Sequence, residues 1–467
     1  MKKIPILLII IFLLSFACCA VSFEGNGTAE SPYVITSVSQ FTEYAKGVNK
    51  GEANYAYAYV KLSSNLDFFD ENYVIIGNAE HPFSGVFDGG GYVVRNISIT
   101  DIPANNTSSE GVFIGMFGYA ENAVFKNVYL DNISVIILDS KTNSDVYVGS
   151  VCGKTEGQVI FEQCGTNGKI DLKMSKAKII TGGIVGEVSA SNSGLRIENS
   201  FSDMDITASS SRRIFAGGIA GNIEINGSDS FFEINKVYYS GDLSVNTSGS
   251  SYAFAGGIVA YAIYEPDWDD VSYYAVLEKA RLLNSTYNIT NSFVNCTIDI
   301  SSANLYVGQI CGYADGVKSA NVYCSSEQTG GNTGYAIRGI PISVSSFTDV
   351  TFISETLTFD TGNIWLCQND RLTLRKADIN NIYAVYSEGV VTVNGTVNGT
   401  VNGASSDIVI IAIKNKNGRL LATGITSCGL LNNYNVSCAD SPYMVQIIVL
   451  NTESLFKPKS DDLHIFM

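Results

Sequence analysis

One short segment combines carboxylates with aromatic rings, residue types suited to carbohydrate chemistry and recognition. Its candidate binding residues are Asp267, Trp268, Asp269, Asp270, Tyr273 and Tyr274. Neighbouring carboxylates can act as general acid and base in glycoside hydrolysis, or bind Ca²⁺ beside a base such as Arg281 in an elimination. Aromatic rings can stack on sugars or on partner proteins. Because the carboxylates share one inserted stretch instead of lying on successive strands, we predict a binding loop with no catalytic residue and no metal site.

Cysteine and histidine chemistry gives little support for a cofactor. The chain has two histidines and no CxxC pair, so neither a zinc site nor another cofactor is expected. Among the cysteines beyond residue 22, Cys428 and Cys438 flank an Asn-rich stretch and are our candidate disulfide, while the other pairings stay open. Cys152 and Cys311 share one position of a repeat and are expected to be buried as small apolar residues.

An apolar hexapeptide bracketed by glycine recurs through the middle of the chain. Copies begin at residues 113 (FIGMFG), 148 (VGSVCG), 181 (TGGIVG), 216 (AGGIAG), 255 (AGGIVA) and 307 (VGQICG). A period of roughly 33 to 52 residues indicates stacked supersecondary units, none of which can bury its apolar face alone. Glycine suits the corners of such units, where the chain turns tightly or two backbones approach closely.

Two further elements complete the repeating unit. An Asn or a substitute for it follows each hexapeptide, as at Asn127, Asn199 and Asn291, and we interpret it as structural. An apolar pair at period two comes next, as at Ile133/Val135 and Ile170/Leu172, which is typical of a half-buried strand. Three strands then form one coil, and stacked coils pair equivalent residues in parallel. One inward column is predicted to hold Phe117, Cys152, Val185, Ala220, Val259 and Cys311.

Loop lengths point to one variable edge of this solenoid. The stretch between hexapeptide and Asn varies most in length, and its longest copy, residues 261–286, contains the predicted binding loop. At the N-terminus, Ser37 or Ser39 can cap a short helix that runs through Val48 and stops at Gly51. Such a helix would cover the open end of the first coil. Residues 346–376, where the repeat weakens, are expected to finish or cap the other end.

Three stretches of the N-terminal half resemble a known family. Residues 25–35, 61–67 and 83–92 look like the opening coils of secreted proteins with GLUG repeats, and the Gly-Gly-Ile-(Val/Ala)-Gly copies at 182 and 217 are closest to the family repeat. The resemblance covers about residues 25–345. It implies a right-handed parallel β-helix of the pectin-lyase type in a surface or secreted protein of bacteria or archaea.

The C-terminal part has a different sequence pattern. Alternating strands are predicted at 383–386, 390–393, 408–413 and 443–450, with three tandem Thr-Val-Asn-Gly copies forming a lengthened hairpin tip at 392–403. These strands suffice for a small sandwich. Residues 415–422 and 455–458 resemble a β-sandwich module found at the C-terminus of secreted bacterial proteins.

The first 22 residues are typical of a secretory signal peptide, with two lysines, an apolar run and small residues before the cleavage point. Lipid attachment at Cys18 is an alternative that the large Phe16 disfavours. No second apolar stretch reaches the length of a membrane span. Loss of Lys2 and Lys3 would take the formal charge from −16 to −18, and no basic block remains, so nucleic acid is not an expected partner.

We therefore expect an all-β chain: a signal peptide over residues 1–22, a parallel β-helix over 23–376 with its cap at about 23–60, and a β-sandwich over 377–467. The expected function is a secreted or cell-surface binding and adhesion scaffold for glycans or partner proteins. The alternative is a polysaccharide lyase or glycoside hydrolase on the same fold, although no Asn-Thr-Asp, paired-Asp and Gly-His-Gly series is present. Thirteen Asn-x-Ser/Thr sequons allow glycosylation in some hosts.

Overall fold

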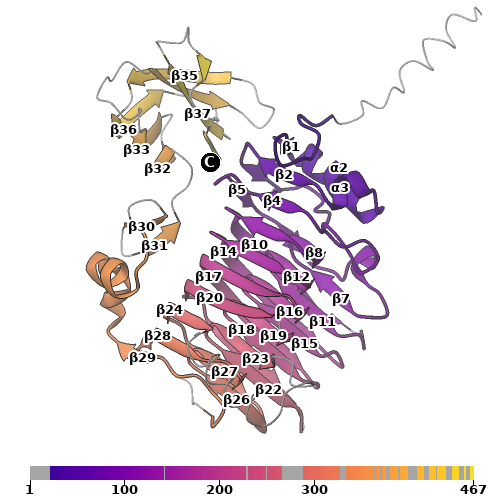
Figure 1. Ribbon diagram of the computed structural model, residues 1–467. Coiled ribbons are helices and arrows are strands. Elements are labelled where there is room, and N and C mark those ends of the chain that lie inside the picture. The colour runs from indigo at the N-terminus through magenta and orange to yellow at the C-terminus, as the bar shows by residue number, and fades with distance from the viewer. Residues whose placement is uncertain are drawn as a thin grey trace, which may run out of the picture.

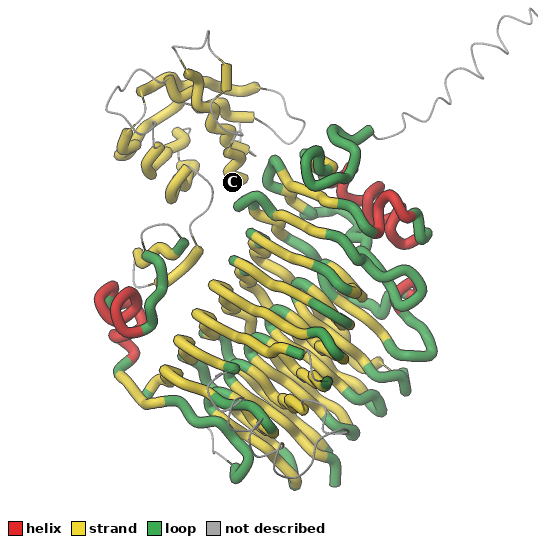
Figure 2. The backbone as a smooth tube through the Cα atoms, in the orientation of Figure 1, coloured by secondary structure: helices red, strands yellow, loops and turns green. Residues whose placement is uncertain are grey.

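The computed structural model of the chain is mostly β (Figures 1 and 2). It describes residues 22–140, 142–227, 230–248, 250–265, 288–326, 333–361, 364–368, 371–374, 379–387, 390–397, 408–414, 420–427, 429–437, 444–451, 457–458 and 463–466. Residues 1–21 of the predicted signal peptide lie outside the described residues. None of the described helices has the length and apolar composition that a membrane span requires.

A helical cap covers the start of the solenoid. Helix α2 (Val38–Asn49) begins at Ser37, whose hydroxyl accepts a hydrogen bond from the Gln40 amide at 3.2 Å, so the first of the two predicted caps is used. Phe41 and Tyr44 are fully buried against the first coils. The short helix α3 (Ala53–Ala56) follows, and the parallel pair β1 (Tyr33–Ile35) and β2 (Tyr59–Leu62) joins the cap to the main sheet.

Three parallel sheets form the walls of the solenoid, as the stacked ribbons in Figure 1 show. Sheet 1 contains β7 (Val112–Ile114), β11 (Val146–Gly149), β15 (Ile179–Gly182), β18 (Ile214–Gly217), β22 (Tyr252–Gly256) and β26 (Asn304–Gly308). Sheet 2 contains β8 (Phe117–Glu121), β12 (Cys152–Glu156), β16 (Val185–Ser191), β19 (Ala220–Asn226), β23 (Val259–Glu265) and β27 (Cys311–Asp315).

Sheet 3 has 17 strands and forms the remaining wall. Besides β1 and β2 it contains β3 (Leu66–Asp67), β4 (Val86–Asp88), β5 (Val93–Arg95), β6 (Ser98–Ile99), β9 (Val124–Lys126), β10 (Tyr129–Ser140), β13 (Val159–Glu162), β14 (Gly165–Met174), β17 (Gly194–Ser210), β20 (Phe231–Tyr239), β21 (Leu243–Thr247), β24 (Ile289–Val294), β25 (Ile298–Ser301), β28 (Ser319–Ser325) and β29 (Ile340–Ile342). The expected parallel β-helix is thus confirmed.

The predicted inward column is present in register. Cys152 pairs with Phe117 on one side and with Val185 on the other, and the pairing continues through Ala220 and Val259 to Cys311. All six side chains are fully buried. One pair of the third strand differs from the prediction, since Val135 and not Ile133 lies opposite Ile170. In the same strand the register of β10 against β14 shifts between Leu130 and Ile133.

The Asn column occupies left-handed corners within sheet 3. Asn127, Asn199 and Asn291 have φ values of 53°, 49° and 49°, a region that Asn tolerates better than most residues. The Asn321 amide donates to Oδ1 of Asn291 at 2.6 Å, so two copies pair across adjacent coils. Asn199 is buried, whereas Asn127 and Asn291 are half-buried. The structural interpretation therefore holds, chiefly because the corner needs this backbone conformation.

The hexapeptide forms the corner between sheets 1 and 2. A Cβ on Gly217 would lie 1.9 Å from the carbonyl oxygen of Ala220, so only glycine allows the chain to turn this sharply. Outward side chains of the two sheets contact each other across this corner. The ring centres of Phe254 and Tyr261, for example, lie 5.2 Å apart. The outer surface is therefore concave along the column of hexapeptides.

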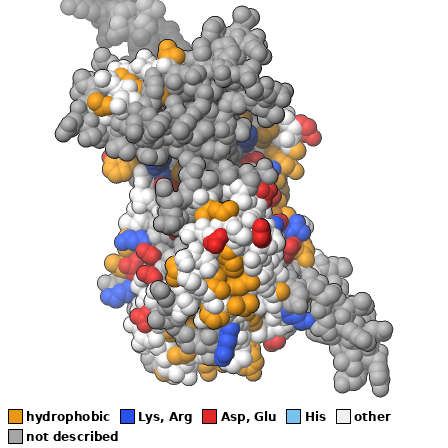
Figure 3. Space-filling model, turned by 90° about the vertical axis from the view of Figure 1, so that its left-hand side faces the viewer, with side chains coloured by type: hydrophobic (Ala, Val, Ile, Leu, Met, Phe, Trp, Pro, Cys, Tyr) orange, Lys and Arg blue, Asp and Glu red, His pale blue; other side chains and the backbone are white. Residues whose placement is uncertain are grey.

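After the last coil the chain returns along the outside of sheet 3 (Figure 1). This return segment contains β29, the turns η3 (Val344–Thr348) and η4 (Phe352–Thr356), and the hairpin β30 (Trp365–Gln368) and β31 (Arg371–Leu374). Trp365 and Phe347 pack on the outward rings of Phe201, Tyr238 and Phe293. Figure 3 views the side on which this segment lies and shows acidic and basic side chains interspersed around a hydrophobic patch. The expected finishing element thus packs along a wall of the solenoid.

Two antiparallel sheets form the C-terminal part, as the fold prediction requires. The first contains β32 (Ile379–Ser387), β33 (Val390–Val397) and β36 (Gly429–Ser437). The second contains β34 (Ile408–Lys414), β35 (Leu420–Ser427), β37 (Met444–Asn451), β38 (Lys457–Pro458) and β39 (Leu463–Phe466). Cys428 and Cys438 lie outside the described residues, on either side of β36, and their pairing stays a prediction.

Candidate functional site

The predicted binding residues Asp267, Trp268, Asp269, Asp270, Tyr273 and Tyr274 lie outside the described residues. What the structure does place is the point where their loop joins the solenoid. Residues 266–287 connect the end of β23 to the start of β24, at the corner where sheet 2 passes to sheet 3. The shorter stretches 122–123, 157–158, 192–193 and 316–318 lie at the same corner, so the longest copy is inserted where other coils turn within two or three residues.

A second feature, which the sequence analysis did not single out, lies on the concave corner between sheets 1 and 2. We call it the corner ladder. Its sheet 1 column contains Phe113, Tyr147, Ile180, Phe215, Phe254 and Tyr306. Its sheet 2 column contains Tyr119, Lys154, Glu187, Asn222, Tyr261 and Tyr313. These residues sit next to each hexapeptide, at positions that alternate with the buried column.

Rings within the corner ladder stack face to face. Phe254 lies 4.9 Å from Tyr306 with an interplanar angle of 4°, and Tyr261 lies 4.9 Å from Tyr313 at 12°. Across the corner the contacts are edge-to-face, as between Tyr306 and Tyr313 at 84°. Stacking of this kind is favourable for aromatic side chains. Because each ring face is covered by the next coil, the ladder presents mainly ring edges and hydroxyl groups outward.

Charged side chains cover the first part of the ladder. The Lys154 ammonium lies 5.5 Å from the centre of the Tyr147 ring and 3.6 Å from a carboxylate oxygen of Glu187. Asn222 donates to both Glu187 and Glu224, at 2.9 and 3.0 Å. A second lysine, Lys178, lies over Tyr147 and Phe215. The carboxylates of this network are therefore already engaged by protein cations and amides.

The ladder becomes more exposed at its end, where Tyr306 and Tyr313 of the last coil are half-buried and Tyr252 and Tyr335 stack beside them. Tyr252 is 43% exposed and Tyr335 is 59% exposed, while Phe113 and Phe215, further up the ladder, are 0% and 5% exposed. Tyr335 extends the stack beyond Tyr313, with ring centres 5.0 Å apart. We refer to the exposed tyrosine end of the ladder, which contains Tyr252, Tyr306, Tyr313 and Tyr335. Its outermost ring, Tyr335, is the most exposed of the four.

Three tyrosine hydroxyls of the ladder have a raised pKa and therefore remain protonated at neutral pH. Burial raises the pKa of Tyr147 and, together with a hydrogen bond to Glu156, that of Tyr119. Burial also raises the pKa of Tyr313, with smaller contributions from Asp315 and neighbouring tyrosines. These groups can act as neutral hydrogen-bond donors and acceptors, a chemistry that suits recognition.

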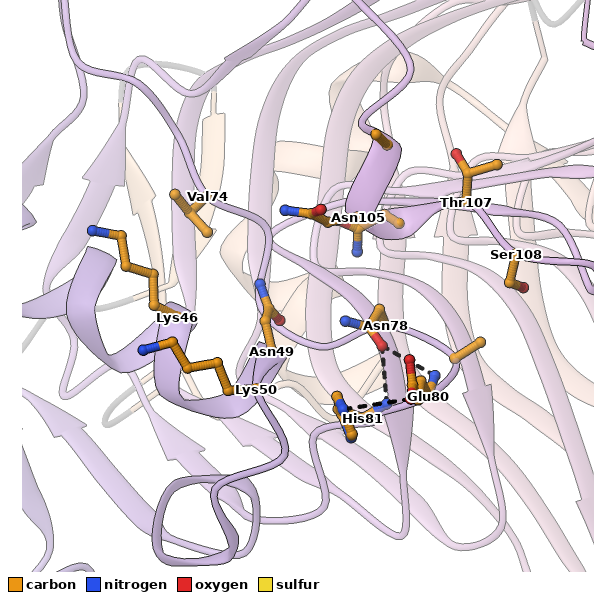
Figure 4. Close-up of a pocket in the computed structure, with 13 residues that line it drawn as sticks. Lys46, Asn49, Lys50, Val74, Asn78, Glu80, His81, Asn105, Thr107 and Ser108 are labelled. Atoms are coloured by element: carbon orange, nitrogen blue, oxygen red, sulfur yellow. Dashed lines mark hydrogen bonds and ion pairs between the residues drawn. The ribbon is translucent and has the colours of Figure 1, made fainter.

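A third feature is a pair of adjoining cavities beside the N-terminal cap, and Figure 4 shows the larger of the two. The larger has a volume of about 570 Å³ and the smaller about 380 Å³. Both are lined by Asn49 of α2, by Val74, and by Ala104 to Asn106, which form the 3-10 turn η1 (Ala104–Asn106). We refer to them together as the cap cavity. Volumes of this size can hold a small polar ligand.

Metal-binding groups of three or more His, Cys, Asp or Glu side chains are not found in the part of the chain that the structure describes. Cys152, Cys164, Cys311 and Cys324 carry free thiols. Burial raises the pKa of the Cys311 thiol to about 12, and Cys152, at the same repeat position, is also fully buried with a raised pKa. These two thiols therefore pack as small apolar side chains, as predicted.

Comparisons with known proteins find local similarity to a distant relative. No family model matches the chain. The chain is 26% identical over 182 residues to halomucin of Haloquadratum walsbyi, a match that covers 36% of this chain. The matched part amounts to 2% of the length of halomucin. The similarity is therefore local and leaves the activity of this chain to be proposed from its own structure.

Proposed function

We propose that this protein is a secreted or cell-surface scaffold that binds glycans or partner proteins without converting them. The exposed tyrosine end carries the proposal. Large rings left in contact with solvent on consecutive coils are typical of recognition surfaces. The solenoid supports the proposal because it holds these rings at fixed intervals, so little order is lost when they bind.

The predicted binding loop belongs to the same proposal. Its N-terminal attachment, the end of β23, lies about four residues, or roughly 13 Å, along the strand from Tyr261 of the ladder. Trp268, Tyr273 and Tyr274 of this loop stay predicted binding residues. The stacked rings also restrict the mode of binding, since a ligand would meet ring edges and hydroxyls along the ladder and a free ring face only at its end.

The alternative is a polysaccharide-cleaving enzyme. One observation favours it, which is that charged side chains lie on successive strands of sheet 2, where a catalytic set of this fold type would have to lie. These side chains are Lys154 and Glu156 on β12, Glu187 on β16 and Glu224 on β19. Against it, Glu187 accepts from Asn222 and pairs with Lys154, so this carboxylate is held in a network that leaves it poorly placed to exchange protons with a substrate. The binding function is therefore preferred.

A glycan array probed with the mature chain tests the proposal. We expect binding that falls at least tenfold in the Tyr306→Ala/Tyr335→Ala variant and also in Trp268→Ala. Tyr57→Ala is the matched control, because Tyr57 is 67% exposed but lies beside α3 at the cap. Partner proteins are tested with the same variants by cross-linking on the surface of the producing cell.

An assay for new reducing ends and unsaturated uronates separates the two functions. No turnover is expected. Turnover that is lost in Asp269→Asn or Asp270→Asn would show that the loop carboxylates are catalytic, and turnover lost in Glu187→Gln would assign that role to the network on sheet 2. Either result would replace the scaffold by the enzyme.

A further inference from the structure

The cap cavity is a built site and not a gap between loosely placed loops. Asn49 Nδ2 donates to the carbonyl oxygen of Ile75 at 2.8 Å, and its Oδ1 accepts from the amide of Gly77 at 2.7 Å. From the opposite side, Asn106 Nδ2 donates to the carbonyl oxygen of Gly77 at 2.8 Å, and Asn106 is 3% exposed. Residues 75–77 are thus held from both sides, and the walls are preorganised.

The first hexapeptide helps to form this site. A Cβ on Gly118 would lie 2.4 Å from Nδ2 of Asn106, so the terminal glycine of the hexapeptide leaves the space through which Asn106 reaches Gly77. The same hexapeptide accepts a hydrogen bond from the Tyr73 hydroxyl at the carbonyl oxygen of Met116, 2.9 Å away. The floor of the cavity therefore rests on the first full coil of the solenoid.

Two amide groups are left to meet a ligand. Oδ1 of Asn78 accepts from the amides of Glu80 and His81, which leaves its Nδ2 without a protein partner among the described residues. The exposed side chain of Asn105 makes no hydrogen bond within the described part of the chain. Figure 4 shows Asn49, Asn78 and Asn105 around the cavity, with Lys46 and Lys50 along one side. A side-chain amide offers a donor and an acceptor that match those of a peptide group.

Charge is distributed unequally along the cap cavity. Lys46, Lys50 and His81 line the larger part, with Glu80 as its only carboxylate among the lining residues. Glu71 and Asp101 line the smaller part, which has no cationic lining residue. The lysine pairs with Glu43 and Glu52 are long, at 3.8 and 3.9 Å, and exposed, so the ammonium groups can turn to a ligand at little cost.

We propose that the cap cavity binds an extended peptide segment with an acidic group in the larger part and a basic group in the smaller part. The Asn78 and Asn105 amides would pair with peptide groups between the two charges. A saccharide is disfavoured because the described lining of the larger part has no tyrosine, tryptophan or phenylalanine on which a sugar could stack. The one ring in the described lining of the smaller part, Tyr73, packs against Phe41 and Phe68.

The proposal does not depend on the exposed tyrosine end, because the cap cavity lies on the first coils and the tyrosines lie on the last. Selection of a random heptapeptide display library on the mature full-length chain tests it. We expect enriched peptides that carry one acidic and one basic residue a few positions apart. Their affinity should fall at least tenfold in Asn105→Ala and in Lys46→Ala/Lys50→Ala, and should weaken with added salt.

Variants elsewhere distinguish this site from the proposed function. Tyr306→Ala/Tyr335→Ala should leave peptide binding unchanged, while Asn105→Ala should leave glycan-array binding unchanged. Circular dichroism and the unfolding midpoint confirm that each variant is folded. The proposal is overturned if no heptapeptide is enriched, if enriched peptides lack the charge pair, or if they bind Asn105→Ala as well as the parent chain. Binding of chito-oligosaccharides that Asn105→Ala abolishes would assign the cavity to a saccharide instead.

Discussion

The indole nitrogen of Trp365 donates a hydrogen bond to Oδ1 of Asn199 at 3.2 Å, across 166 positions of sequence. Asn199 forms a left-handed corner in the middle of the solenoid, and Trp365 belongs to the segment that returns along its outer wall. The repeat corner therefore has a second role as a docking point. This contact, together with the buried indole, fixes where the return segment lies against sheet 3.

The docking contact predicts a large stability effect. Trp365 is fully buried, so Trp365→Ala should lower the free energy of unfolding by about 3–5 kcal/mol. Trp365→Phe retains most of the packing and should cost less, about 1–2 kcal/mol, chiefly through the hydrogen bond to Asn199. Chemical denaturation measures both. Ile340→Ala is the control, since Ile340 is 53% exposed in the same segment; equal effects of Trp365→Ala and Ile340→Ala would contradict the packing described here.

The hexapeptide corner predicts that one methyl group is not tolerated. A Cβ on Gly217 would meet the Ala220 carbonyl oxygen at 1.9 Å, inside a backbone that has no room to move. Gly217→Ala should therefore destabilise the chain by several kcal/mol or prevent folding, beyond the cost of ordinary overpacking, about 1–3 kcal/mol. Gly334→Ala is the matched control because nothing lies within 4 Å of its Cβ position. Similar thermal midpoints for the two variants would show that the corner can relax.

The network over the ladder predicts an unequal response of two lysines. Lys154 and Glu187 have side chains that are 13% and 11% exposed, whereas Lys46 and Glu43 are 52% and 44% exposed. Lys154→Met should cost about 1–3 kcal/mol because it leaves a largely buried carboxylate without its cation. Lys46→Met should stay within about 0.5 kcal/mol. The two variants are compared by urea denaturation at neutral pH. If Lys154→Met left the free energy of unfolding unchanged, the hydrogen bond from Asn222 would be sufficient to stabilise the Glu187 carboxylate.

Stability is predicted to fall at alkaline pH. Burial raises the pKa of Cys311 from 9.0 to about 12, and burial likewise raises the pKa of Cys164 to about 12. In the unfolded chain these thiols ionise near pH 9, so above that pH the unfolded state binds fewer protons than the native state. The contribution of these thiols to the free energy of unfolding is therefore complete below pH 9 and is lost progressively up to about pH 12. Each thiol loses up to about 1.4 kcal/mol for each pH unit.

Denaturation at a series of pH values checks this slope. The Cys311→Ala variant should start from a lower stability, because of the smaller side chain, but should show a shallower decline between pH 9 and 11. Thiol reagents at pH 8 should leave Cys152, Cys164 and Cys311 unmodified until the chain unfolds. A decline as steep in the variant as in the parent would assign the alkaline effect to the buried tyrosines, whose pKa values burial also raises, as at Tyr239.

The repeat could be predicted from the sequence in detail because it is a local and periodic signal. The column from Phe117 to Cys311, the cap at Ser37 and the variable edge all follow from spacing that recurs coil after coil. Where the period is disturbed, the prediction is less exact: in β10, whose register against β14 shifts, Val135 occupies the position opposite Ile170 that was expected for Ile133. Backbone pairing across coils decides such a shift, and a single copy of the repeat does not reveal it.

The surfaces could not be predicted in the same way. A stacked parallel β-helix can be predicted from the repeat alone, because apolar residues at period two and glycine corners can be buried only by stacking equivalent coils. Folding, in contrast, brings the outward residues of sheets 1 and 2 together across a concave corner, places Lys154 and Lys178 over its first rings, and leaves Tyr335 exposed. Those outcomes depend on contacts between residues that are far apart in the chain, and no local pattern records them.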